Sequence, residues 1–473
     1  MLLGIDLGTS SVKAAVMAED GSVEEVTSAS YPMESPAPGW AETDPADWWQ
    51  ATRQVVTSLA ANHRQEIAAI GLSGQMHGVV LTDADGQPLR PAILWADGRA
   101  AGELARYQKL PPRLRELLAN PLAPGMAGPT LLWIRRHESR LYDAARWALQ
   151  PKDWLRLRLT SQARTEPTDA SATLLYDLGK DTWAQDVLRE LDIRPSLLPD
   201  VIASHELAGR LTDVAAQELG LAPGLPVAAG AADAAASLLG HGVLDPGTVL
   251  LTIGTGAQLS SIRTELHPDP TARTNLYRTV ESSKWYAMAA ILNAGLALDW
   301  ARTVFAVEWP VLYRSAAEVP PGAGGVTFVP HLVGERIPHL ESGADARWSG
   351  IALHHRREHL LKAVLEGVAF ALREAMERLE AAGIPVVELR LAGGGAVDGA
   401  WRQLLADVLG KPLRATPSWV GSARGAALLA GVSAGIYKGI SDSPAGDLST
   451  AVVAEPGARA NEYAALYQRR MHP

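Results

Sequence analysis

Two aspartates stand beside apolar, strand-like runs of the sequence. Asp6 lies within the run from Leu2 to Leu7, and Asp233 follows the run from Leu225 to Ala232. Ligands of α/β sheets bind beyond the carboxyl ends of strands, so both carboxylates could reach one cleft. A carboxylate at such a place can help to hold a divalent cation. The alternative for Asp233 is a turn or a helix N-cap, and its small neighbours favour neither interpretation.

A glycine–threonine turn follows Asp6, and a second one occurs near the middle of the chain. The first is Gly8-Thr9-Ser10-Ser11 and the second is Gly254-Thr255-Gly256. Each joins two β-prone runs, and a turn without bulky side chains lets backbone N–H groups converge on an anion. One such turn is most often only a tight hairpin. Two of them, each at the first hairpin of a half-chain, favour a clamp on the phosphates of a nucleotide. No GxxxxGK[ST] sequence is present, so neither is a Walker A loop.

A third glycine-rich segment, Gly393-Gly394-Gly395-Ala396, lies between a predicted strand and a predicted helix. A backbone without side chains would let a flat base or a ribose lie on it. Taken alone, the segment is better explained as a close turn from strand to helix.

Polar side chains gather at two strand ends that one hairpin joins. Met76 and His77 follow the first strand, and Trp95, Asp97 and Arg99 follow the second. Sugar binding needs directed hydrogen-bond donors and acceptors together with a flat apolar surface, which this set supplies. A single histidine is more often a structural residue, but a cluster at one end of a sheet favours a binding site.

Composition and charge exclude several classes of protein. The chain has 473 residues, of which 47% are hydrophobic and 20% charged, as expected of a globular protein with two or more domains. A net charge of −9 argues against nucleic acid as a partner. No apolar run is long enough for a membrane span, and no basic, apolar leader opens the chain. The absence of cysteine excludes disulfides and fits a reducing cytoplasm. His354, His355 and His359 are interpreted as solvated rings at a helix start rather than as a metal site.

The sequence pattern predicts alternating strands and helices as the elements that position these residues. Residues 1–30 predict a β-meander with a hairpin turn at Asp20-Gly21. Asp44 and Pro45 predict the start of a helix that runs to Leu59. A buried strand over 67–73 precedes a hairpin about Asp85-Gly86. Helices dominate from 100 to 220, including 130–136 and 182–191, and a strand over 225–230 follows.

The second half repeats this style. After the hairpin at Gly254, the pattern predicts a long helix over 358–382, a strand over 387–392, a helix over 399–409 and a small-residue helix over 423–434. We therefore expect two similar α/β domains with a cleft between them, residues 1–243 and residues 244–473.

The ordered set of segments resembles the FGGY carbohydrate kinases, of the actin/Hsp70/hexokinase ATPase superfamily. No single segment is specific, but together they cover residues 4 to about 434. They are Gly4 to Ser10, Gly39 to Glu42 with Asp44-Pro45 and Trp48-Trp49, Gln75 to Gly78, Ile93 to Arg99, Ala232-Asp233, Gly254 to Gly256, Gly334 to His339, Val364 to Phe370, and Gly393 to Ala396 with Trp401 to Gln403. Met76-His77-Gly78 favours the members that act on xylulose, a ketopentose, over glycerol kinase.

The resemblance implies a fold, two ligands and roles for the candidate residues. The fold would be two ribonuclease-H-like domains around a central cleft, with the sugar on the first and ATP on the second. Asp233 matches the catalytic base, and Asp6 matches the carboxylate near Mg²⁺ and the γ-phosphate, so both are candidate metal-binding residues. The sugar-binding set would be Met76, His77, Trp95, Asp97 and Arg99. The ATP-binding set would be Thr9, Ser10, Lys13, Gly254, Thr255, Gly256, Gly394, Gly395 and Ala396.

The implied reaction is transfer of the γ-phosphoryl group of ATP to the primary hydroxyl of the ketopentose, with Asp233 taking the proton. Ala234, Ala96 and Asp398 depart from the family pattern, and they leave the sugar open between xylulose, ribulose, gluconate and erythritol or another polyol. An ATP-driven protein of the actin or Hsp70 class and an inactive sugar sensor are the alternatives from other classes. A homodimer is expected from the family alone.

Overall fold

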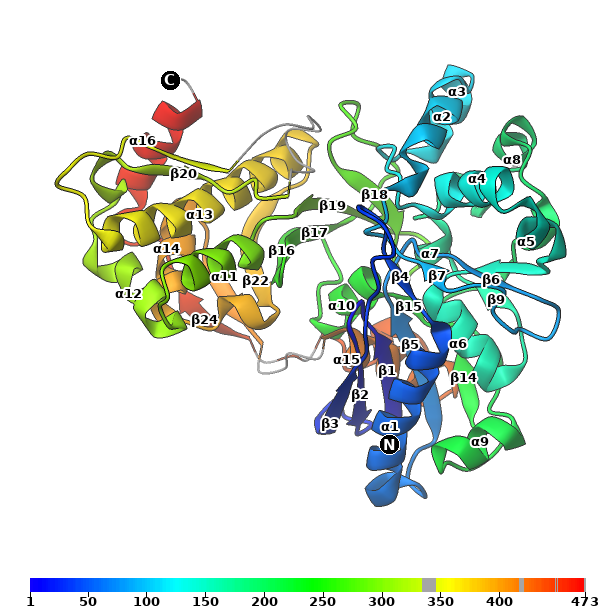
Figure 1. Ribbon diagram of the computed structural model, residues 1–473. Helices are drawn as coiled ribbons and strands as arrows, with labels where there is room; N and C mark the ends of the chain where they lie inside the picture. Colours follow the sequence, from blue (N-terminus) through cyan, green and yellow to red (C-terminus); the bar gives the residue numbers. More distant parts are fainter. Residues whose placement is uncertain (334–345, 417–420, 447, 449, 472–473) are drawn as a thin grey trace.

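The structure, a computed structural model, describes residues 1–333, 346–416, 421–446, 448 and 450–471. Figure 1 shows two lobes, one holding the first part of the chain and the other most of the second part. Each lobe is built on its own mixed sheet, with helices packed around it. Within these residues no helix is long and apolar enough to cross a membrane. The segment from Gly334 to His339, which contributed to the family resemblance, lies outside the described residues.

The sheet of the first lobe begins with the expected meander. Its strands lie in the order β13-β14-β5-β1-β2-β3, and β15 pairs with the end of β5. The bounds are β1 Leu2–Leu7, β2 Ser11–Met17, β3 Val23–Ser30, β5 Ala69–Gly74, β13 Leu207–Arg210, β14 Pro226–Ala228 and β15 Ala231–Ala232. The turn between β2 and β3 contains Gly21, whose φ of 88° suits glycine.

The sheet of the second lobe repeats this arrangement from β19 to β24 and adds β18 as a further edge strand. Its order is β18-β19-β17-β16-β22-β23-β24. The bounds are β16 Gly247–Ile253, β17 Ala257–Arg263, β18 Asn275–Arg278, β19 Trp285–Ile291, β22 Val386–Ala392, β23 Leu413–Ala415 and β24 Ala451–Ala454. In both lobes an antiparallel hairpin starts the sheet, two parallel strands follow it, and an antiparallel strand ends it. The expected two-domain α/β fold is confirmed.

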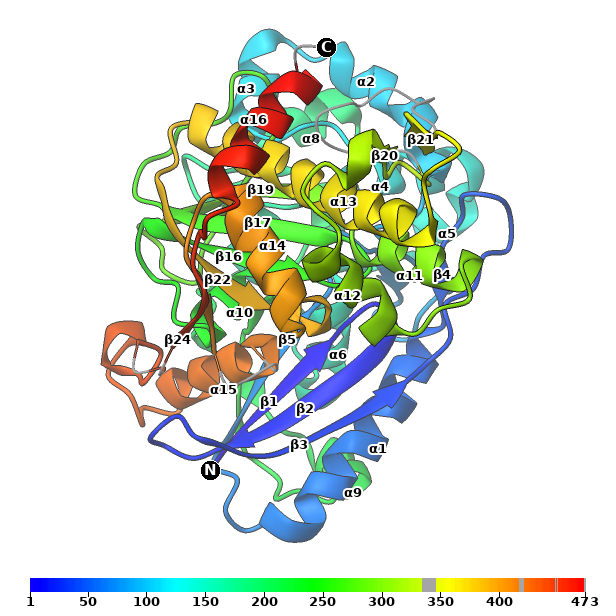
Figure 2. The same ribbon diagram turned by 90° about the vertical axis from the view of Figure 1, so that its left-hand side faces the viewer.

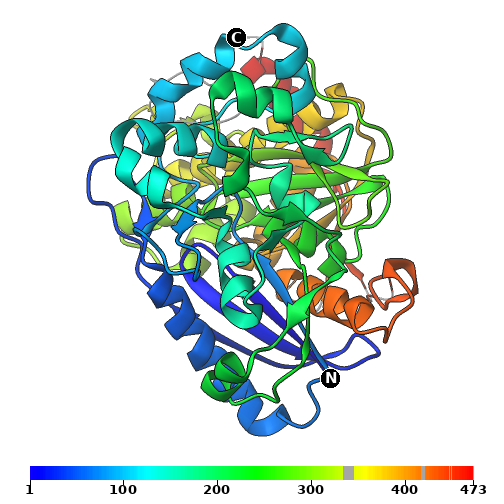
Figure 3. The same ribbon diagram turned by 90° about the vertical axis from the view of Figure 1, so that its right-hand side faces the viewer.

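Helices cover both faces of the sheets, and short strand pairs join the loops. The helices of the first lobe are α1 Pro45–His63, α2 Leu104–Gln108, α3 Pro112–Leu118, α4 Ala127–His137, α5 Ser139–Ala144, α6 Pro151–Thr160, α7 Pro167–Ala170, α8 Gln185–Leu191, α9 Asp213–Leu219 and α10 Asp233–Gly240. Figure 3 shows α2 to α5 and α8 at the end of this lobe that lies away from the N-terminus, whereas α6 packs against the sheet.

The later helices and the short strands complete the fold. The helices are α11 Gly295–Val304, α12 Trp309–Glu318, α13 Arg357–Ala381, α14 Gly399–Leu409, α15 Gly421–Ser433 and α16 Ala460–Met471. The short pairs are β4 Glu42–Thr43 with β7 Ala92–Ile93, β6 Val80–Thr82 with β8 Trp147–Leu149, β9 Arg164–Thr165 with β12 Asp200–Val201, β10 Tyr176–Asp177 with β11 Thr182–Trp183, and β20 Thr327–Val329 with β21 Arg347–Ser349.

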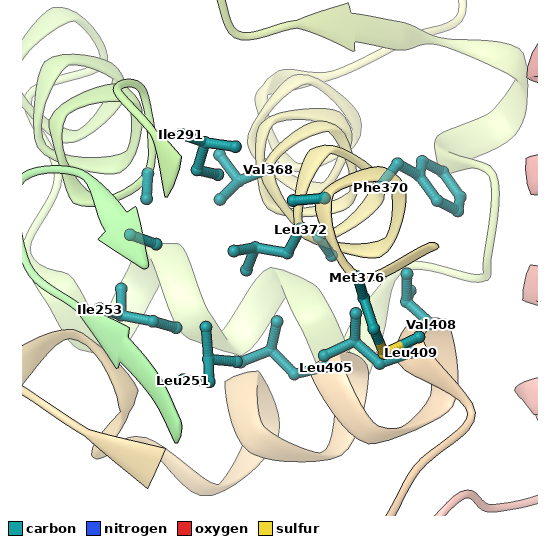
Figure 4. Packing of buried hydrophobic residues seen from close by; sticks show 14 of the residues in the cluster. Leu251, Ile253, Ile291, Val368, Phe370, Leu372, Met376, Leu405, Val408 and Leu409 are labelled. Carbon is teal, nitrogen blue, oxygen red and sulfur yellow. The ribbon is translucent and has the colours of Figure 1, made fainter. Parts of the chain in front are cut away.

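The core of the second lobe forms between its sheet and the helices α13 and α14. Leu251 and Ile253 of β16 and Ile291 of β19 point toward the helices in Figure 4, where Val368 and Leu372 of α13 meet them. All five residues are buried. Side chains repeat on one face every two residues in a strand and every 3.6 in a helix, so apolar residues at these spacings all face the core. This packing fixes the strand end from which Gly254 follows.

Two small-residue helices, α10 and α15, pack closely where the two lobes meet. Although α15 comes late in the sequence, it packs on β1 and β5 of the first sheet, on the face opposite α1 (Figure 2). The approach is so close that a Cβ at Gly4 would lie 1.8 Å from the carbonyl oxygen of Ala423, and one at Gly240 would lie 1.7 Å from that of Gly421. Glycine is therefore required on both sides of α15. The domain boundary at 243/244 stays a prediction.

Several local expectations hold and one needs correction. The side chain of Asp44 caps α1, and the predicted bounds of α14 agree with the structure. The helix expected over 182–191 begins only at Gln185, because Thr182 and Trp183 pair with β10 as a strand. The hairpin expected about Asp85-Gly86 is present as a turn between antiparallel bridges, Thr82 with Pro88 and Val79 with Ile93, and β6 also pairs with β8.

Gly4→Ala should unfold the contact between α15 and the first sheet. The added methyl overlaps a backbone carbonyl, which cannot move aside without displacing the helix, so we expect a loss of about 3 kcal/mol or more in the free energy of unfolding. Urea unfolding measures it. Gly102→Ala is the control, because its Cβ would meet no atom within 4 Å and should change stability by less than about 0.5 kcal/mol. Equal stability of the two variants would contradict this packing.

Candidate active site

Asp6 lies at the end of β1, directly before the first glycine–threonine turn. The Ser73 hydroxyl of the neighbouring parallel strand β5 donates to its carboxylate over 3.0 Å. Burial raises the pKa of Asp6, and the bond from Ser73 and the positive charge of Lys13, its cross-strand neighbour, partly offset that rise. Asp6 as a whole residue is partly exposed to solvent. It is placed to meet a cation without being freely solvated.

The first turn is fixed from several sides. The N–H of Gly8 donates to the carbonyl of Ser11 over 3.0 Å, and the hydroxyl of Tyr31 and the amide of Gln75 donate to the carbonyl of Gly8. The indole N–H of Trp95 donates to the hydroxyl of Thr9 over 3.0 Å. The predicted phosphate turn and the predicted sugar cluster are therefore in direct contact.

Asp233 is the first residue of α10, immediately after β15. Its carboxylate accepts the N–H of Ala234, the next residue of that helix, over 2.7 Å, and the N-cap position itself is Ala232. β15 pairs with the end of β5 through Ala231 opposite Ser73, the residue that bonds Asp6. Both carboxylates thus lie at one sheet end, as the sequence suggested. Burial and the nearby negative charge of Asp6 raise the pKa of Asp233 to about 7.

The second turn and the triple-glycine loop lie together in the second lobe. Gly254 follows Ile253 of β16, and its N–H donates to the carbonyl of Gly256 over 2.9 Å. A Cβ at Gly393 would lie 2.4 Å from the carbonyl oxygen of Ile253, and one at Gly395 would lie 2.5 Å from the side chain of the same residue. The loop therefore packs directly against the turn, and its glycines are required. Asp398 caps the following helix α14, which accounts for an aspartate at that departure from the family pattern.

A pocket of about 220 Å³ lies between the two lobes. From the first lobe it is lined by three of the predicted sugar-binding residues and by a loop of small and apolar residues: His77, Trp95, Asp97 with Ala96 and Gly98, and Pro121 to Met126. From the second lobe it is lined by β18, β19 and the loop before them: Ala272, Arg273, Asn275, Tyr277, Met288 and Ala290. A mostly apolar wall with a few directed polar groups is typical of a small-molecule site.

Met76 and His77 are held in strained or buried positions beside this pocket. His77 has a φ of 72°, a left-handed conformation that a residue with a Cβ adopts at a cost. Its Nδ1 lies 2.8 Å from the carbonyl oxygen of Ala172, so it carries the proton and donates. The hydroxyl of Tyr286 donates to the sulfur of Met76 over 3.8 Å, and burial first, then the charges of Tyr277 and Asp233, raise the pKa of Tyr286. Tyr286 is thus a buried neighbour of both Met76 and Asp233.

Arg99 does not line the pocket. Its guanidinium makes two hydrogen bonds to Asp97, at 2.8 and 2.7 Å, contacts Glu42 and stacks on Trp40. Asp97 also accepts the N–H of Ala41 over 2.6 Å. The side chain of Arg99 therefore supports Asp97 from behind, and only Asp97 of this pair reaches the pocket.

Asn120 attaches the edge of the second sheet to the first lobe. Its side-chain oxygen accepts the N–H of Leu276 over 2.9 Å, and its amide donates to the carbonyl of the same residue over 2.8 Å. β18 is an edge strand, so these groups have no partner in the sheet. Farther along β18, Arg278 pairs with Asp181 of the first lobe. These contacts close one side of the pocket.

Sequence reasoning missed several residues of this region. They are Tyr31, Ser73, Asn120, Tyr277 and Tyr286. Each acts through a partner far away in the sequence, so local patterns carry no signal for them. Among the described residues no group of three or more His, Asp or Glu side chains could hold a metal ion.

Comparison with known proteins agrees with this geometry. Residues 1–240 match the N-terminal domain of the FGGY family of carbohydrate kinases, and residues 249–434 match its C-terminal domain. The xylulose kinase of Escherichia coli (strain K12) is 36% identical over 93% of this chain and 91% of its own, and that of Bacillus subtilis (strain 168) is 34% identical over 93% and 90%. The crystal structure of the xylulose kinase from Rhodospirillum rubrum superposes with a TM-score of 0.89 at 31% identity, covering 100% of this chain and 97% of that one.

Asp233→Asn should stabilise the fold increasingly as pH rises. The folded carboxyl keeps its proton up to about pH 7, whereas in the unfolded chain it loses it near pH 4. The folded state binds more protons between these values, so stability of the wild type falls there as pH rises. We expect the gain from the substitution to be about 2 to 3 kcal/mol larger at pH 8 than at pH 5. Urea unfolding at both pH values measures it, and a gain independent of pH would refute the raised pKa.

Asn120→Ala should loosen β18 selectively. Both hydrogen bonds to Leu276 are lost, so we expect amide exchange of this residue to accelerate about tenfold, the equivalent of about 1.4 kcal/mol. Hydrogen exchange followed by mass spectrometry measures it, with β23 as an internal reference. Asn62→Ala removes an exposed asparagine whose side chain bonds only Glu25, and should leave β18 unchanged. Unchanged exchange in both variants would contradict the attachment.

Proposed function

The chain belongs to the FGGY family of carbohydrate kinases, and from this premise we propose that it phosphorylates the primary hydroxyl of D-xylulose with ATP, giving D-xylulose 5-phosphate. The relatives of highest identity reported above are xylulose kinases. The observation that carries the proposal is the position of Asp233. Asp233 is a partly exposed residue whose carboxyl has a pKa of about 7, and it lies close to Asp6 at the sheet end that carries the first glycine–threonine turn.

The second lobe fits the nucleotide. A Cβ at Gly394 would meet no atom within 4 Å, so this face of the triple-glycine loop is open to a ligand. The exposed backbone of Gly254 and Thr255 lies beside it. We assign the adenosine side to Gly394, Gly395 and Ala396, and the phosphates to Gly254, Thr255 and Gly256, with Thr9, Ser10 and Lys13 on the opposite wall.

Asp6, with Asp233, fits a hydrated magnesium ion. Mg²⁺ keeps several waters and is held in proteins through one or two carboxylates, so a larger cluster is not needed. Bound Mg·ATP would supply the phosphoryl group and the charge that neutralises its oxygens. The raised pKa of both carboxyls means that a nearby cation would also bring them to their charged forms.

The first lobe fits the acceptor. We propose that His77 and Asp97 bond the hydroxyls of the ketopentose and that Trp95 forms its apolar wall. Met76, next to His77 in the chain, completes this wall in the proposal. Arg99 acts on the sugar only through Asp97. Asp233 takes the proton of the primary hydroxyl as that oxygen attacks in line, which as general base catalysis contributes about 10²- to 10⁴-fold. The larger share comes from holding the two substrates in position.

Three finer features belong to this proposal. The boundary at 243/244 divides the sugar-binding domain from the ATP-binding domain. The enzyme works in the cytoplasm, where its substrates are made and consumed. It forms a homodimer and has no nucleic-acid or membrane partner.

Asp233→Ala should abolish sugar phosphorylation while the protein stays folded. We expect kcat to fall at least 100-fold, because the base is lost, with the KM for ATP changed less than threefold. A coupled assay of ADP release with xylulose measures it. Asp186→Ala, at an exposed site on α8, is the control that should match the wild type. Activity of Asp233→Ala within tenfold of the wild type would overturn the assignment of the base.

The same assay across acceptors decides the sugar. We expect xylulose to give a higher kcat/KM than ribulose, gluconate, erythritol or glycerol. A preference for any of these compounds would leave the proposed kinase activity intact and change only the assigned substrate. ADP release that no sugar stimulates would favour an ATPase of the actin or Hsp70 class instead.

A further inference from the structure

A fully buried ionic cluster lies behind the peptide that carries Asp233. Lys152 and Arg156 of α6 supply two positive charges, and Asp153, Glu166 and Asp169 supply three negative ones, all without solvent exposure. The ammonium of Lys152 lies 2.7 Å from Asp153, 3.2 Å from Asp169 and 3.4 Å from Glu166. Such groups are rarely buried unless they are paired, and apolar residues of similar volume would often stabilise a fold equally well. The cluster therefore calls for a role beyond stability.

A single hydroxyl links this cluster to the strand before Asp233. The Thr168 hydroxyl donates to Glu166 Oε1 over 2.8 Å and accepts the backbone N–H of Ala232 over 2.8 Å. A hydroxyl has only one proton, so its bond to Glu166 forces a lone pair toward Ala232. The carboxylate of Glu166 thus sets the orientation of the backbone N–H of Ala232, the residue before Asp233, through two successive hydrogen bonds.

Glu166 is itself held in one position. Its two oxygens accept the N–H groups of Thr168 and Asp169 and the hydroxyl of Ser204, at 2.8, 3.0 and 2.9 Å. Lys152 adds its charge from the side of α6. Because every partner is buried, the carboxylate has no alternative arrangement of similar energy.

The rest of the peptide is fixed by the same group of elements. Arg156 donates to the carbonyl of Ala229 over 2.5 Å, and the N–H of Gly230 donates to the carbonyl of Ser204 over 2.9 Å. On the opposite side, Ala231 and Ala232 pair with the end of β5. The backbone from Ala229 to Ala232 is therefore held by hydrogen bonds along its whole length. These bonds are more numerous than the pairing of the two-residue strand β15 alone would require.

We propose that Thr168, held by Glu166 and Lys152, is a positioning residue that sets the place of the Asp233 carboxylate for proton transfer. The inference rests on the proposed function. Proton transfer requires the carboxylate within hydrogen-bond reach of the acceptor hydroxyl, and a displacement of about 1 Å can lower a rate about 100-fold. Thr168 is not among the residues proposed to bind either substrate, so the step that suffers is chemistry rather than binding.

The test is Thr168→Val, which keeps the shape and removes the hydroxyl. We expect kcat for xylulose to fall 10- to 100-fold, with the KM values for xylulose and ATP changed less than threefold. Thr168→Ser restores the hydroxyl and should recover kcat to within threefold of the wild type. Ser204→Ala, which removes one donor to Glu166, should lower kcat about threefold with the same unchanged KM values, and it serves if the valine variant does not fold.

Thr52→Val is the matched control. Thr52 is also fully buried, on α1, but its hydroxyl has no hydrogen-bond partner in the described part of the chain, so its loss should leave kcat unchanged. A folded Thr168→Val with kcat within twofold of the wild type, or a serine variant as slow as the valine variant, would overturn the proposal. A wild type without xylulose-dependent ADP release would instead count against the proposed function, so the two failures are distinguishable.

Discussion

The parallel pairing of β5 on both of its sides is the constraint on which the site depends. At Ser73 the strand faces Asp6 of β1 on one side and Ala231 of β15 on the other. Neighbouring strands lie about 4.8 Å apart, so Asp6 and Ala231 are separated by roughly 10 Å. Asp233, two residues farther on, turns into its helix at the same sheet end. One strand therefore sets the spacing of both carboxylates, and the close packing of α15 on Gly4 and Gly71 keeps that strand in place.

This spacing gives the site its electrostatic character. Two carboxylates in a partly closed cleft repel each other and lose hydration, so both pKa values rise, that of Asp233 to about 7. Keeping both carboxylates charged in such a site is unfavourable when no ligand is bound. A cation and a donating hydroxyl would lower this cost. Lys13 and Ser73 compensate Asp6 in part, whereas within the described residues the Asp233 carboxylate accepts a hydrogen bond from the N–H of Ala234 alone. The proposed roles follow from this difference: Asp6, the better compensated carboxylate, helps to hold the metal ion, and Asp233, with the higher tendency to keep a proton, acts as the base.

The sequence carried most of the local structure but little of the contact between distant parts. The cap at Asp44 and the bounds of α14 follow from neighbouring residues, so they could be predicted. The packing of α15 on the first sheet, the attachment of β18 to Asn120 and the withdrawal of Arg99 from the pocket could not. Each depends on a partner that the fold brings from elsewhere in the chain, and a single sequence contains no record of which partner that is.

The two lobes have similar sheet topologies and yet are proposed to bind different ligands. The loops at equivalent strand ends account for this difference. The turn after β1 corresponds to the turn after β16, and both present backbone donors suited to phosphate. The loop after β5 corresponds to the loop after β22. In the first lobe that loop carries Met76 and His77, whose side chains fill the space beside the pocket. In the second lobe it is Gly393 to Gly395, where any side chain at the outer glycines would strike Ile253 and the middle one leaves an open face. Side chains at one strand end select an acceptor, and their removal at the equivalent end leaves a bare backbone for a nucleotide.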